Sequence, residues 1–477
     1  MSGRLLLVSY HFGPGCDTGG FRWNAMTAHL AQAGWEVEVI SAARAGADRP
    51  YEFAPGVRVT PVGVPTWLGD AVRSAGQFKR RLVGDGSAPA EPGPDSGCQT
   101  VPAGAKARPS LGARLYTAVM GNVDAAGRWS AELGWARRAA RAGVAVARSH
   151  APTVVAVSSP PHPTHMAGVW LAEALGVPYL ADFRDPWVFG EPDSVQDTLI
   201  DLRRGALAQR RCFDTATLAV FNTTWAAAAA VAHDRSLASR SATVPNGYDP
   251  RTGIGHPDPD LFRVAFVGWL YDFMDPEPLL AGCARLRHRA GLDRLRVEFV
   301  GTDSAPGGVS LLARMRAHGL EPYFEHHRRV PRKQALLTQE RAAVQVVFDY
   351  PGPLRVPMKF YDAAQNYGDL LLIGRSNSAL ADAAVQLGYG VCPPGDPVAI
   401  DAVLDRALAR WRARDYPHPV DREGLFARRR TSARMLELLE GMPGPGAPAR
   451  ERSDGGSGSL RAGHPARSGD ASSQQGD

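Results

Sequence analysis

Short apolar runs alternate with helical stretches along most of the chain. Residues 5–9 are continuously apolar, which predicts a buried strand, and a glycine-rich loop at 13–20 follows. Residues 21–33 carry apolar side chains at helical spacing, and Gly34 ends that helix. A strand connected through a helix to the next strand predicts a parallel sheet. The alternation also predicts strands at 37–41, 57–61, 153–158, 178–181 and 217–221, and helices at 129–149, 164–175 and from 224 onward.

The pattern restarts near residue 261. Two successive α/β units of comparable size predict the fold class, which is two Rossmann-like doubly wound parallel-sheet domains facing each other across a cleft. The join lies at 245–259, which is rich in proline, glycine and aspartate. In the second unit the predicted strands are 261–267, 297–300, 342–348 and 370–373, and the predicted helices are 277–290, 309–318 and 359–367.

The boundaries follow from this division. We expect an N-terminal domain over 1–250, a C-terminal domain over 258–420 and a C-terminal helix over 421–442. Residues 84–110 are too polar and too rich in proline and glycine to pack, so they predict a disordered insertion. Residues 443–477 consist largely of glycine, serine, proline and charged side chains, and they predict a disordered tail.

Composition narrows the class of protein. The chain has 477 residues and 44% hydrophobic residues, which excludes disorder throughout. The five cysteines lie far apart without a CxxC pair, which argues against structural zinc and favours a reducing cytoplasm. We find neither a signal peptide nor a run of about 20 apolar residues. The net charge of +6 fits an acidic ligand or an anionic membrane surface, and equally an arginine-rich composition without such a partner.

The glycine-rich loop is the first candidate for chemistry. In open parallel sheets, ligands bind beyond the carboxyl ends of the strands, and a glycine-rich turn that enters a helix offers free N–H groups to an anion. Gly13 and Gly15 are followed by Cys16 without the third glycine of a dinucleotide fingerprint, so NAD is not expected. A tight turn without a ligand accounts for the same pattern.

Two further groups of polar residues follow predicted strands or begin predicted helices. Arg184 offers a rigid fork for phosphate, and Asp185 can accept a sugar hydroxyl, although an Asp–Arg pair that caps the turn fits as well. Lys359 and Asp362 share a helix face and suit a phosphate and a ribose, or else form a solvated ion pair. His165 is a candidate base or acceptor contact, with a purely structural role as the alternative. The adjacent histidines at 326 and 327 are interpreted as surface residues of a loop.

Four segments together resemble the GT-B glycosyltransferases, and specifically the exopolysaccharide-type members of glycosyltransferase family 4. Residues 5–42 resemble that family's first strand, glycine loop, helix and second strand. Residues 154–187 resemble a block found in the exopolysaccharide-type members, and VPNGYD at 244–249 resembles the interdomain turn. Residues 356–374 resemble the donor-site helix and the strand after it. Each motif alone is weak, whereas their order and spacing together are specific.

The resemblance implies transfer of a sugar from a nucleotide-sugar donor, UDP- or GDP-linked, to an acceptor hydroxyl. It implies retention of anomeric configuration and no required metal or cofactor. It also implies that the C-terminal domain at 258–420 binds the nucleotide-sugar donor and that the N-terminal domain at 1–250 binds the acceptor. Asp362 takes the place of the family's ribose-binding glutamate, and Lys359 matches a basic residue of the same motif. The implied catalytic residues are Arg184, Asp185 and His165, and the implied donor-binding residues are Gly19, Gly20, Asn246, Gly268, Arg355, Lys359 and Asp362.

The chain departs from the family pattern at two places. Leu354 stands eight residues before Asp362, where the family often has a glutamate that contacts the sugar. The segment after Gly268 lacks the basic pair that grips the diphosphate in many members. Arg355, Lys359 or Arg375 must then supply the positive charge.

These observations predict a glycosyltransferase in the synthesis of cell-surface polysaccharide, glycolipid or a natural-product glycoside. The acceptor is a glycan, a lipid-linked molecule or a small molecule, and nucleic acid is not expected as a partner. Basic and apolar residues mix at 77–83 and 135–148, which fits contact with the inner membrane face or a solvated surface. Two alternatives stay open, namely a nucleotide-sugar 2-epimerase, for which no convincing acidic pair is found, and a catalytically silent nucleotide-sugar-binding protein.

Overall fold

The computed structural model describes residues 3–445, except 17, 44–47, 65–110, 191–198, 304 and 306–307. The side chains of residues 18, 111–124 and 199–201 are also left undescribed. The expected insertion at 84–110, the basic segment at 77–83 and the expected tail from 446 onward therefore lie outside the described residues. Within the described part, no helix carries an apolar stretch long enough to cross a bilayer.

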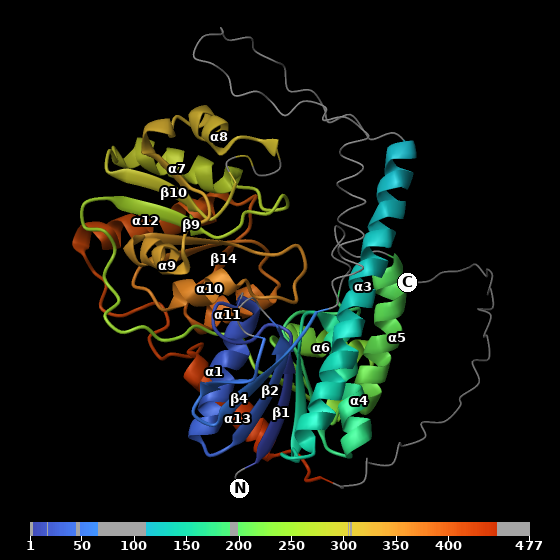
Figure 1. The fold of residues 1–477 in the computed structure, drawn as a ribbon. Coiled ribbons are helices and arrows are strands. Elements are labelled where there is room, and N and C mark those ends of the chain that lie inside the picture. The colour runs from blue at the N-terminus through green and yellow to red at the C-terminus, as the bar shows by residue number, and fades with distance from the viewer. Residues whose placement is uncertain are drawn as a thin grey trace, which may run out of the picture. The chain divides into compact units, whose positions relative to one another are not determined.

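The N-terminal half contains an eight-stranded sheet in the order β3-β4-β2-β1-β5-β6-β7-β8 (Figure 1). Only the edge strand β3 runs antiparallel to its neighbour, β4. The strands are β1 (Arg4–Ser9), β2 (Glu36–Ala42), β3 (Tyr51–Ala54), β4 (Val57–Val62), β5 (Val154–Ser159), β6 (Tyr179–Phe183), β7 (Leu218–Phe221) and β8 (Ser241–Thr243).

Helices cover both faces of this sheet, which explains why its central strands are apolar throughout. Successive side chains of a strand point to opposite faces, so Leu6 and Val8 of β1 join one core, while Leu5 and Leu7 join another. Helices on these faces are α1 (Thr18–Gln32), α3 (Leu111–Ala147), α4 (His165–Leu175), α5 (Leu199–Thr215) and α6 (Thr224–His233).

The C-terminal half contains a six-stranded, fully parallel sheet in the order β11-β10-β9-β12-β13-β14. Separate hydrophobic clusters again pack on its two faces. The strands are β9 (Phe262–Val267), β10 (Leu295–Val300), β11 (Phe324–His327), β12 (Val344–Phe348), β13 (Asp369–Ile373) and β14 (Val391–Cys392), and the helices are α7 (Glu277–Ala290), α8 (Leu311–Ala317), α9 (Arg332–Arg341), α10 (Met358–Ala364), α11 (Ala379–Gln386) and α12 (Pro397–Ala413).

The last helix, α13 (Arg428–Glu440), returns to the N-terminal sheet, and Figure 1 shows it beside α1. Met435 and Leu439 of α13 are buried in the same core as Trp23 of α1. The polypeptide therefore crosses between the two sheets twice, once after β8 and once before α13.

The predicted fold class is confirmed, since two helix-covered and mostly parallel sheets follow one another along the chain. The loop interpretation of His326 and His327 is wrong, because both belong to β11, an edge strand. Its polar sequence, FEHH, lacks the apolar run by which buried strands are recognised. The pattern also missed β3, β8, β14, α5, α9, α11 and α12.

Candidate functional site

A pocket of about 310 Å³ lies at the carboxyl ends of strands from both sheets. Such strand ends are where open parallel sheets bind ligands. The N-terminal half contributes His11, Gly19, Arg22, Pro160, Arg184, Asp185, Asn222, Asn246 and Gly247, and the C-terminal half contributes Tyr350, Arg355, Val356, Met358 and Arg428. We call this the arginine pocket.

The lining carries a net positive charge, because it includes four arginines and a single carboxylate, that of Asp185. Two of these arginines, Arg22 and Arg428, are each paired with an aspartate outside the lining. Guanidinium groups form short, charge-assisted and often bidentate hydrogen bonds with phosphate and carboxylate oxygens. A concave site of one charge sign also raises the local concentration of ligands of the opposite sign. The pocket therefore suits an anionic ligand.

Arg22 is held by the buried carboxylate of Asp182. Its Nη2 and Nε donate to the two carboxylate oxygens at 2.9 and 3.2 Å, and both side chains are buried. Asp182 also accepts hydrogen bonds from Trp23 and Ser158. The remaining nitrogen of Arg22 donates to the carbonyl of Pro245 at 2.9 Å. Arg22 therefore shapes the pocket floor, and most of its charge is already neutralised.

Arg184 has different surroundings. Its Nε and Nη2 donate to the carbonyl oxygens of Ser159 and Pro160, at 3.0 and 2.7 Å, and its side chain is buried. In the described part of the chain, no carboxylate lies within ion-pair distance of it. Its Nη1 faces Gly19, where an added Cβ would lie only 2.8 Å away. Burial lowers the pKa of Arg184 and the nearby Asp185 raises it, but an arginine keeps its charge. This guanidinium is the pocket's best anion ligand.

Two more arginines close the pocket from the C-terminal half. Arg428 opens α13, forms an ion pair with Asp249 and donates its backbone N–H to Tyr248 at 2.9 Å. Arg355 lies over the ring of Tyr350, with 5.0 Å between the guanidinium carbon and the ring centroid. Both side chains line the arginine pocket, so positive charge approaches a ligand from both halves.

Lys359 lies next to the loop after β9 rather than in the pocket lining. Its Nζ donates to the carbonyl of Trp269 at 2.8 Å and lies 4.6 Å from the ring centroid of Phe266. Burial lowers the pKa of Lys359 to about 8. Gly268 packs directly on this side chain with a φ of +124°, so both the backbone conformation and the space require glycine there.

Asp362 is engaged by an arginine that the sequence pattern did not single out. Arg332 donates to its two carboxylate oxygens at 2.8 and 3.2 Å. The same guanidinium lies 4.7 Å from the ring centroid of Phe21 in α1, which links the two halves. Asp362 thus lies in α10, as its fifth residue rather than at its start, with its carboxylate oriented by Arg332 and buried to a large extent.

His165 lies outside the arginine pocket. It is fully buried, and its ring nitrogens are 2.8 Å from the hydroxyls of Tyr179 and Ser159. Burial holds the pKa of His165 well below its usual value. Burial also lowers the pKa of His162, which stacks on Trp187, to about 3. Both imidazoles are neutral near pH 7 and lie behind the Ser159–Pro160 segment that holds Arg184.

The structure thus brings five of the proposed site residues, Gly19, Asn246, Arg184, Asp185 and Arg355, into one pocket. The other five, Gly20, Gly268, Lys359, Asp362 and His165, are not part of its lining. Gly20 lies just behind, packed on Cys16. Leu354 packs against the N-terminal core and accepts a hydrogen bond from Thr223 through its carbonyl, so this position serves the contact between halves. Sequence reasoning missed Arg22, Tyr350 and Arg428, although Arg22 is the second residue after the glycine loop and Tyr350 is the second residue after β12.

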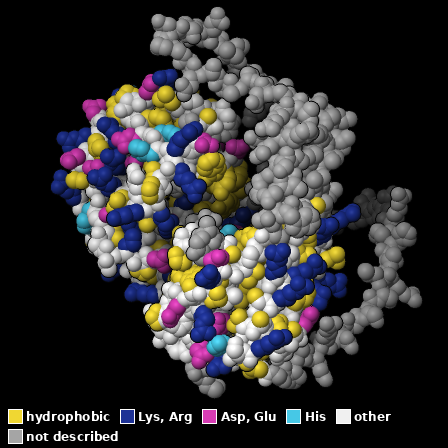
Figure 2. All heavy atoms as spheres, in the orientation of Figure 1, with side chains coloured by type: hydrophobic (Ala, Val, Ile, Leu, Met, Phe, Trp, Pro, Cys, Tyr) yellow, Lys and Arg dark blue, Asp and Glu magenta, His cyan; other side chains and the backbone are white. Residues whose placement is uncertain are grey.

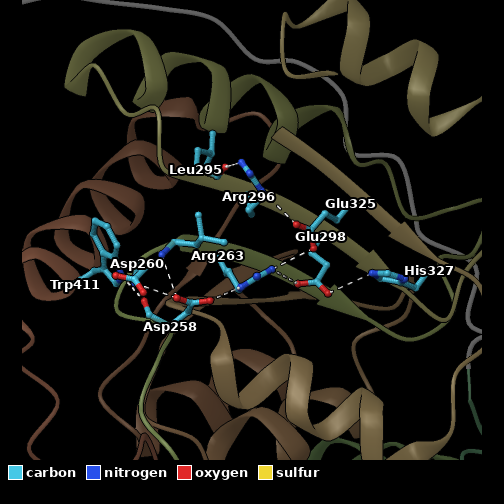
Figure 3. A network of polar contacts seen from close by, with 10 residues as sticks. Asp258, Asp260, Arg263, Leu295, Arg296, Glu298, Glu325, His327 and Trp411 are labelled. Carbon is cyan, nitrogen blue, oxygen red and sulfur yellow. Dashed lines mark hydrogen bonds and ion pairs between the residues drawn. The ribbon is translucent and has the colours of Figure 1, made fainter. Parts of the chain in front are cut away.

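A second polar cluster lies on the C-terminal sheet, away from the pocket lining (Figure 3). Glu298, Glu325 and His327 place one ligand atom each within 4.8 Å of one another. However, Arg263 donates to both glutamates, at 3.3 and 3.2 Å, and to Asp258 at 3.0 Å. The guanidinium therefore already engages all three carboxylates, and we assign the cluster to the joining of β9, β10 and β11.

The fold and the pocket together define an α/β protein with two mostly parallel sheets and an arginine-lined pocket at its strand ends. No protein-family model and no curated protein sequence matches the chain. Among solved structures, a sucrose-phosphate synthase from Thermosynechococcus elongatus matches with a TM-score of 0.58 and 14% identity, over 92% of this chain and 98% of that one. Anabaena HepE in complex with UDP-glucose matches with a TM-score of 0.52 and 11% identity, over 92% and 99% of the two chains.

A lipopolysaccharide outer core galactosyltransferase, WaaB, also matches, with a TM-score of 0.51 and 10% identity over 91% of this chain and 99% of that one. At such low identities the likeness establishes the fold. The chain has the GT-B fold, in agreement with the resemblance seen in its sequence.

Proposed function

We propose that this chain is a glycosyltransferase that moves a sugar from a UDP- or GDP-sugar to an acceptor hydroxyl. The observation that carries the proposal is Arg184, a buried guanidinium with an Nη1 directed into a pocket that both halves line. A nucleotide-sugar presents a diphosphate, which is the anion that such a pocket suits. The fold shared with a galactosyltransferase and with a protein solved in complex with UDP-glucose supports the same assignment.

In the proposed reaction, the bond between the sugar's anomeric carbon and the diphosphate oxygen breaks, and the electron pair leaves with the diphosphate. The acceptor oxygen forms the new bond to the anomeric carbon on the same face, which retains the configuration. The acceptor proton passes to the departing phosphate oxygen. Arg184 and Arg355 stabilise the charge that develops there, and Asp185 orients the acceptor hydroxyl.

The other residues complete donor binding in this proposal. Lys359 adds positive charge near the phosphates, and Asp362, already oriented by Arg332, accepts hydrogen bonds from the ribose hydroxyls. His165 supports the Ser159 segment from behind. Because guanidinium and ammonium groups supply the countercharge, we propose that neither a metal nor a cofactor is required.

The test uses the full chain and candidate UDP-, GDP- and dTDP-sugars. Ligand stabilisation of the fold identifies the donor, and nucleotide release is then followed with and without acceptor. A transferase releases nucleotide in an acceptor-dependent manner, and excess EDTA leaves the rate unchanged. A 2-epimerase converts the sugar without such release, and a silent binding protein shows stabilisation alone. Arg184→Met is expected to lower turnover roughly 10²–10³-fold, whereas the surface variant Arg329→Ser leaves turnover unchanged.

We propose further that an arginine-rich face of the N-terminal half contacts an anionic membrane surface, where a lipid-linked or glycan acceptor is available. Helix α3 exposes Arg137, Arg138 and Arg141, and Arg148 is exposed directly after it. Neighbouring α5 exposes Arg203, Arg204 and Arg210 around Leu207, which is 74% exposed. Figure 2 shows Lys and Arg side chains gathered over the region of α3. Basic side chains around an exposed apolar one are typical of peripheral membrane contact.

Vesicle co-sedimentation tests this contact. The chain is expected to pellet with phosphatidylglycerol-containing vesicles at low salt and to be released at about 0.5 M salt, because the Debye length shortens to a few ångströms. The variant Arg137→Ser/Arg141→Ser/Arg148→Ser should stay in the supernatant, and the control Arg328→Ser/Arg329→Ser should pellet. Equal pelleting of both variants contradicts the contact.

A further inference from the structure

The loop after β9 exposes three large aromatic side chains within five residues. Trp269, Tyr271 and Phe273 are 48%, 37% and 43% exposed. Tyr271 and Phe273 are stacked, with ring centroids 5.2 Å apart and planes 5° from parallel. Single exposed apolar residues are common on proteins, whereas an exposed aromatic group of this size indicates a binding surface.

A third ring extends this surface from the next strand. Tyr350, which follows β12, has its centroid 6.4 Å from that of Tyr271 and 6.1 Å from that of Phe273. The resulting aromatic platform, Tyr271, Phe273 and Tyr350, lies at the carboxyl edge of the C-terminal sheet, where ligands of open parallel sheets bind.

A second cavity, of about 510 Å³, adjoins the platform. This volume lies within the range of small-molecule sites, and a mostly apolar wall with a few polar groups is also typical of them. We call it the platform pocket. Its apolar lining includes Phe273, Met274, Phe348, Tyr350, Pro351 and Ile373, and its polar lining includes Asp349, Arg375, Ser376 and Asn377.

The polar groups of the platform pocket are held in place. Asp349 is buried, and its two oxygens accept hydrogen bonds from the Ser378 hydroxyl at 2.9 Å and from the Tyr350 N–H at 2.8 Å. A carboxylate oxygen accepts more than one hydrogen bond, so each retains capacity for a ligand hydroxyl. Arg375 and Asn377 add donors on the same side.

The charges distinguish this cavity from the arginine pocket. The platform pocket is lined by the carboxylates of Asp275 and Asp349 and by one cation, Arg375. It therefore does not favour a diphosphate. A neutral ligand with one apolar face and a hydroxyl-bearing edge matches both the aromatic platform and the polar side, and a sugar ring is such a ligand.

We propose that the platform pocket binds a neutral sugar ring of the acceptor, so that the acceptor contacts the C-terminal half as well as the N-terminal domain that the family resemblance implies. Tyr350 lines both cavities, so a saccharide bound here lies beside the site where the donor diphosphate is placed. The C–H face of the ring stacks on Phe273, and its hydroxyls bond to Asp349, Arg375 and Asn377. This inference rests on the proposed glycosyltransferase function for the role of acceptor, but sugar binding itself is measurable without turnover.

Saturation-transfer NMR on the full chain tests the proposal with three neutral probes, the methyl glycosides of glucose, galactose and mannose. At least one probe should receive saturation at the C–H protons of one ring face. Phe273→Ala and Asn377→Ala should each weaken its binding roughly tenfold, the scale of one aromatic pair or one hydrogen bond. Leu337→Ala, at an exposed apolar position of α9, is the matched control and should leave binding unchanged.

Competition separates the acceptor from the donor. Excess UDP should leave the probe bound, because the arginine pocket takes the diphosphate. Displacement of the probe by UDP would assign the platform pocket to the donor and overturn the proposal. Unchanged probe binding in Phe273→Ala would also overturn it, as would the absence of NMR saturation transfer to all three probes. The chain could instead bind the sugar probe independently of UDP but show no transferase turnover. That result would contradict the proposed function alone and would leave the platform pocket as a sugar-binding site.

Discussion

Asp182 of β6 accepts both hydrogen bonds of its ion pair with Arg22 of α1, and both side chains are buried. The two residues are 160 positions apart in the chain. The indole of Trp23 and the hydroxyl of Ser158 complete the shell around the carboxylate, at 2.7 and 3.0 Å. The floor of the arginine pocket is therefore a fully bonded buried network joining α1, β5 and β6, which prepositions the segments that carry Gly19 and Arg184.

The first prediction concerns the stability of that network. Asp182→Ala leaves the Arg22 guanidinium buried and unpaired, so it should lower the free energy of unfolding by about 3–5 kcal/mol. Urea unfolding followed by circular dichroism measures the change. Asp405→Ala removes a half-exposed partner of Arg289 and should cost at most about 1 kcal/mol, because exposed pairs are worth little. Equal losses in both variants would contradict the role given to Asp182.

The second prediction uses the close approach of Gly19 to Arg184. A Cβ at position 19 would lie 2.8 Å from the Arg184 Nη1, so Gly19→Ala should push the guanidinium away from its pocket position. We expect a drop in turnover of at least tenfold, since small displacements of a charge-stabilising group are costly in rate. The melting temperature should change little, because the guanidinium keeps room to move into the pocket. Gly63→Ala is the control, because a Cβ there would meet only the Arg138 Nη1, at 4.0 Å. Normal turnover in Gly19→Ala would refute the importance of the contact between Gly19 and Arg184.

The third prediction is a pH dependence from Lys359. Burial lowers its pKa to about 8, so the free enzyme loses this positive charge as the pH rises through that value. The charged form attracts phosphate, and kcat/KM for the donor should therefore fall above about pH 8. A pH profile of kcat/KM reports groups of the free enzyme and measures this step. Lys359→Arg keeps its charge at high pH and should remove the step.

Removal of the Lys359 side chain should lower turnover more than deprotonation of its amine does. Lys359→Ala is expected to lower turnover roughly 10²–10³-fold, the effect of one electrostatic donor. Lys333→Ala, in α9, is the control for removal of an exposed lysine. Near-normal donor hydrolysis or transfer in Lys359→Ala would refute the assignment of this residue to the phosphate site.

The fourth prediction separates Asp362 from Arg332. If the carboxylate receives the ribose hydroxyls, Asp362→Asn should weaken UDP or GDP binding roughly tenfold or more, because hydrogen bonds to a charged group are strong. Arg332→Ala removes only the group that orients the carboxylate and should weaken binding less. Isothermal titration calorimetry with the free nucleotide compares the two. A larger effect of Arg332→Ala would assign nucleotide binding to the arginine instead.

Local patterns predicted the parts of the fold that depend on neighbouring residues. Helix 277–290 matches α7 residue for residue, and the run at 5–9 falls within β1, because burial on both faces of a parallel strand demands an uninterrupted apolar sequence. The edge strand β11 escaped prediction, because Phe324–His327 lies at the margin of the sheet and needs no such run. Helix α5 escaped because four arginines interrupt its apolar pattern.

The sequence by itself determined that two α/β units follow one another, with polar loops after their strands, since hydrophobic periodicity is a property of adjacent positions. Only the tertiary structure decided which of those loops meet. Asp182 finds Arg22, Arg332 finds Asp362, and Arg428 reaches the pocket from a helix that begins after the C-terminal sheet is complete. Such contacts depend on the strand order and on the chain crossings, which bring together residues far apart in the sequence. The spacing of neighbouring residues does not predict such long-range contacts.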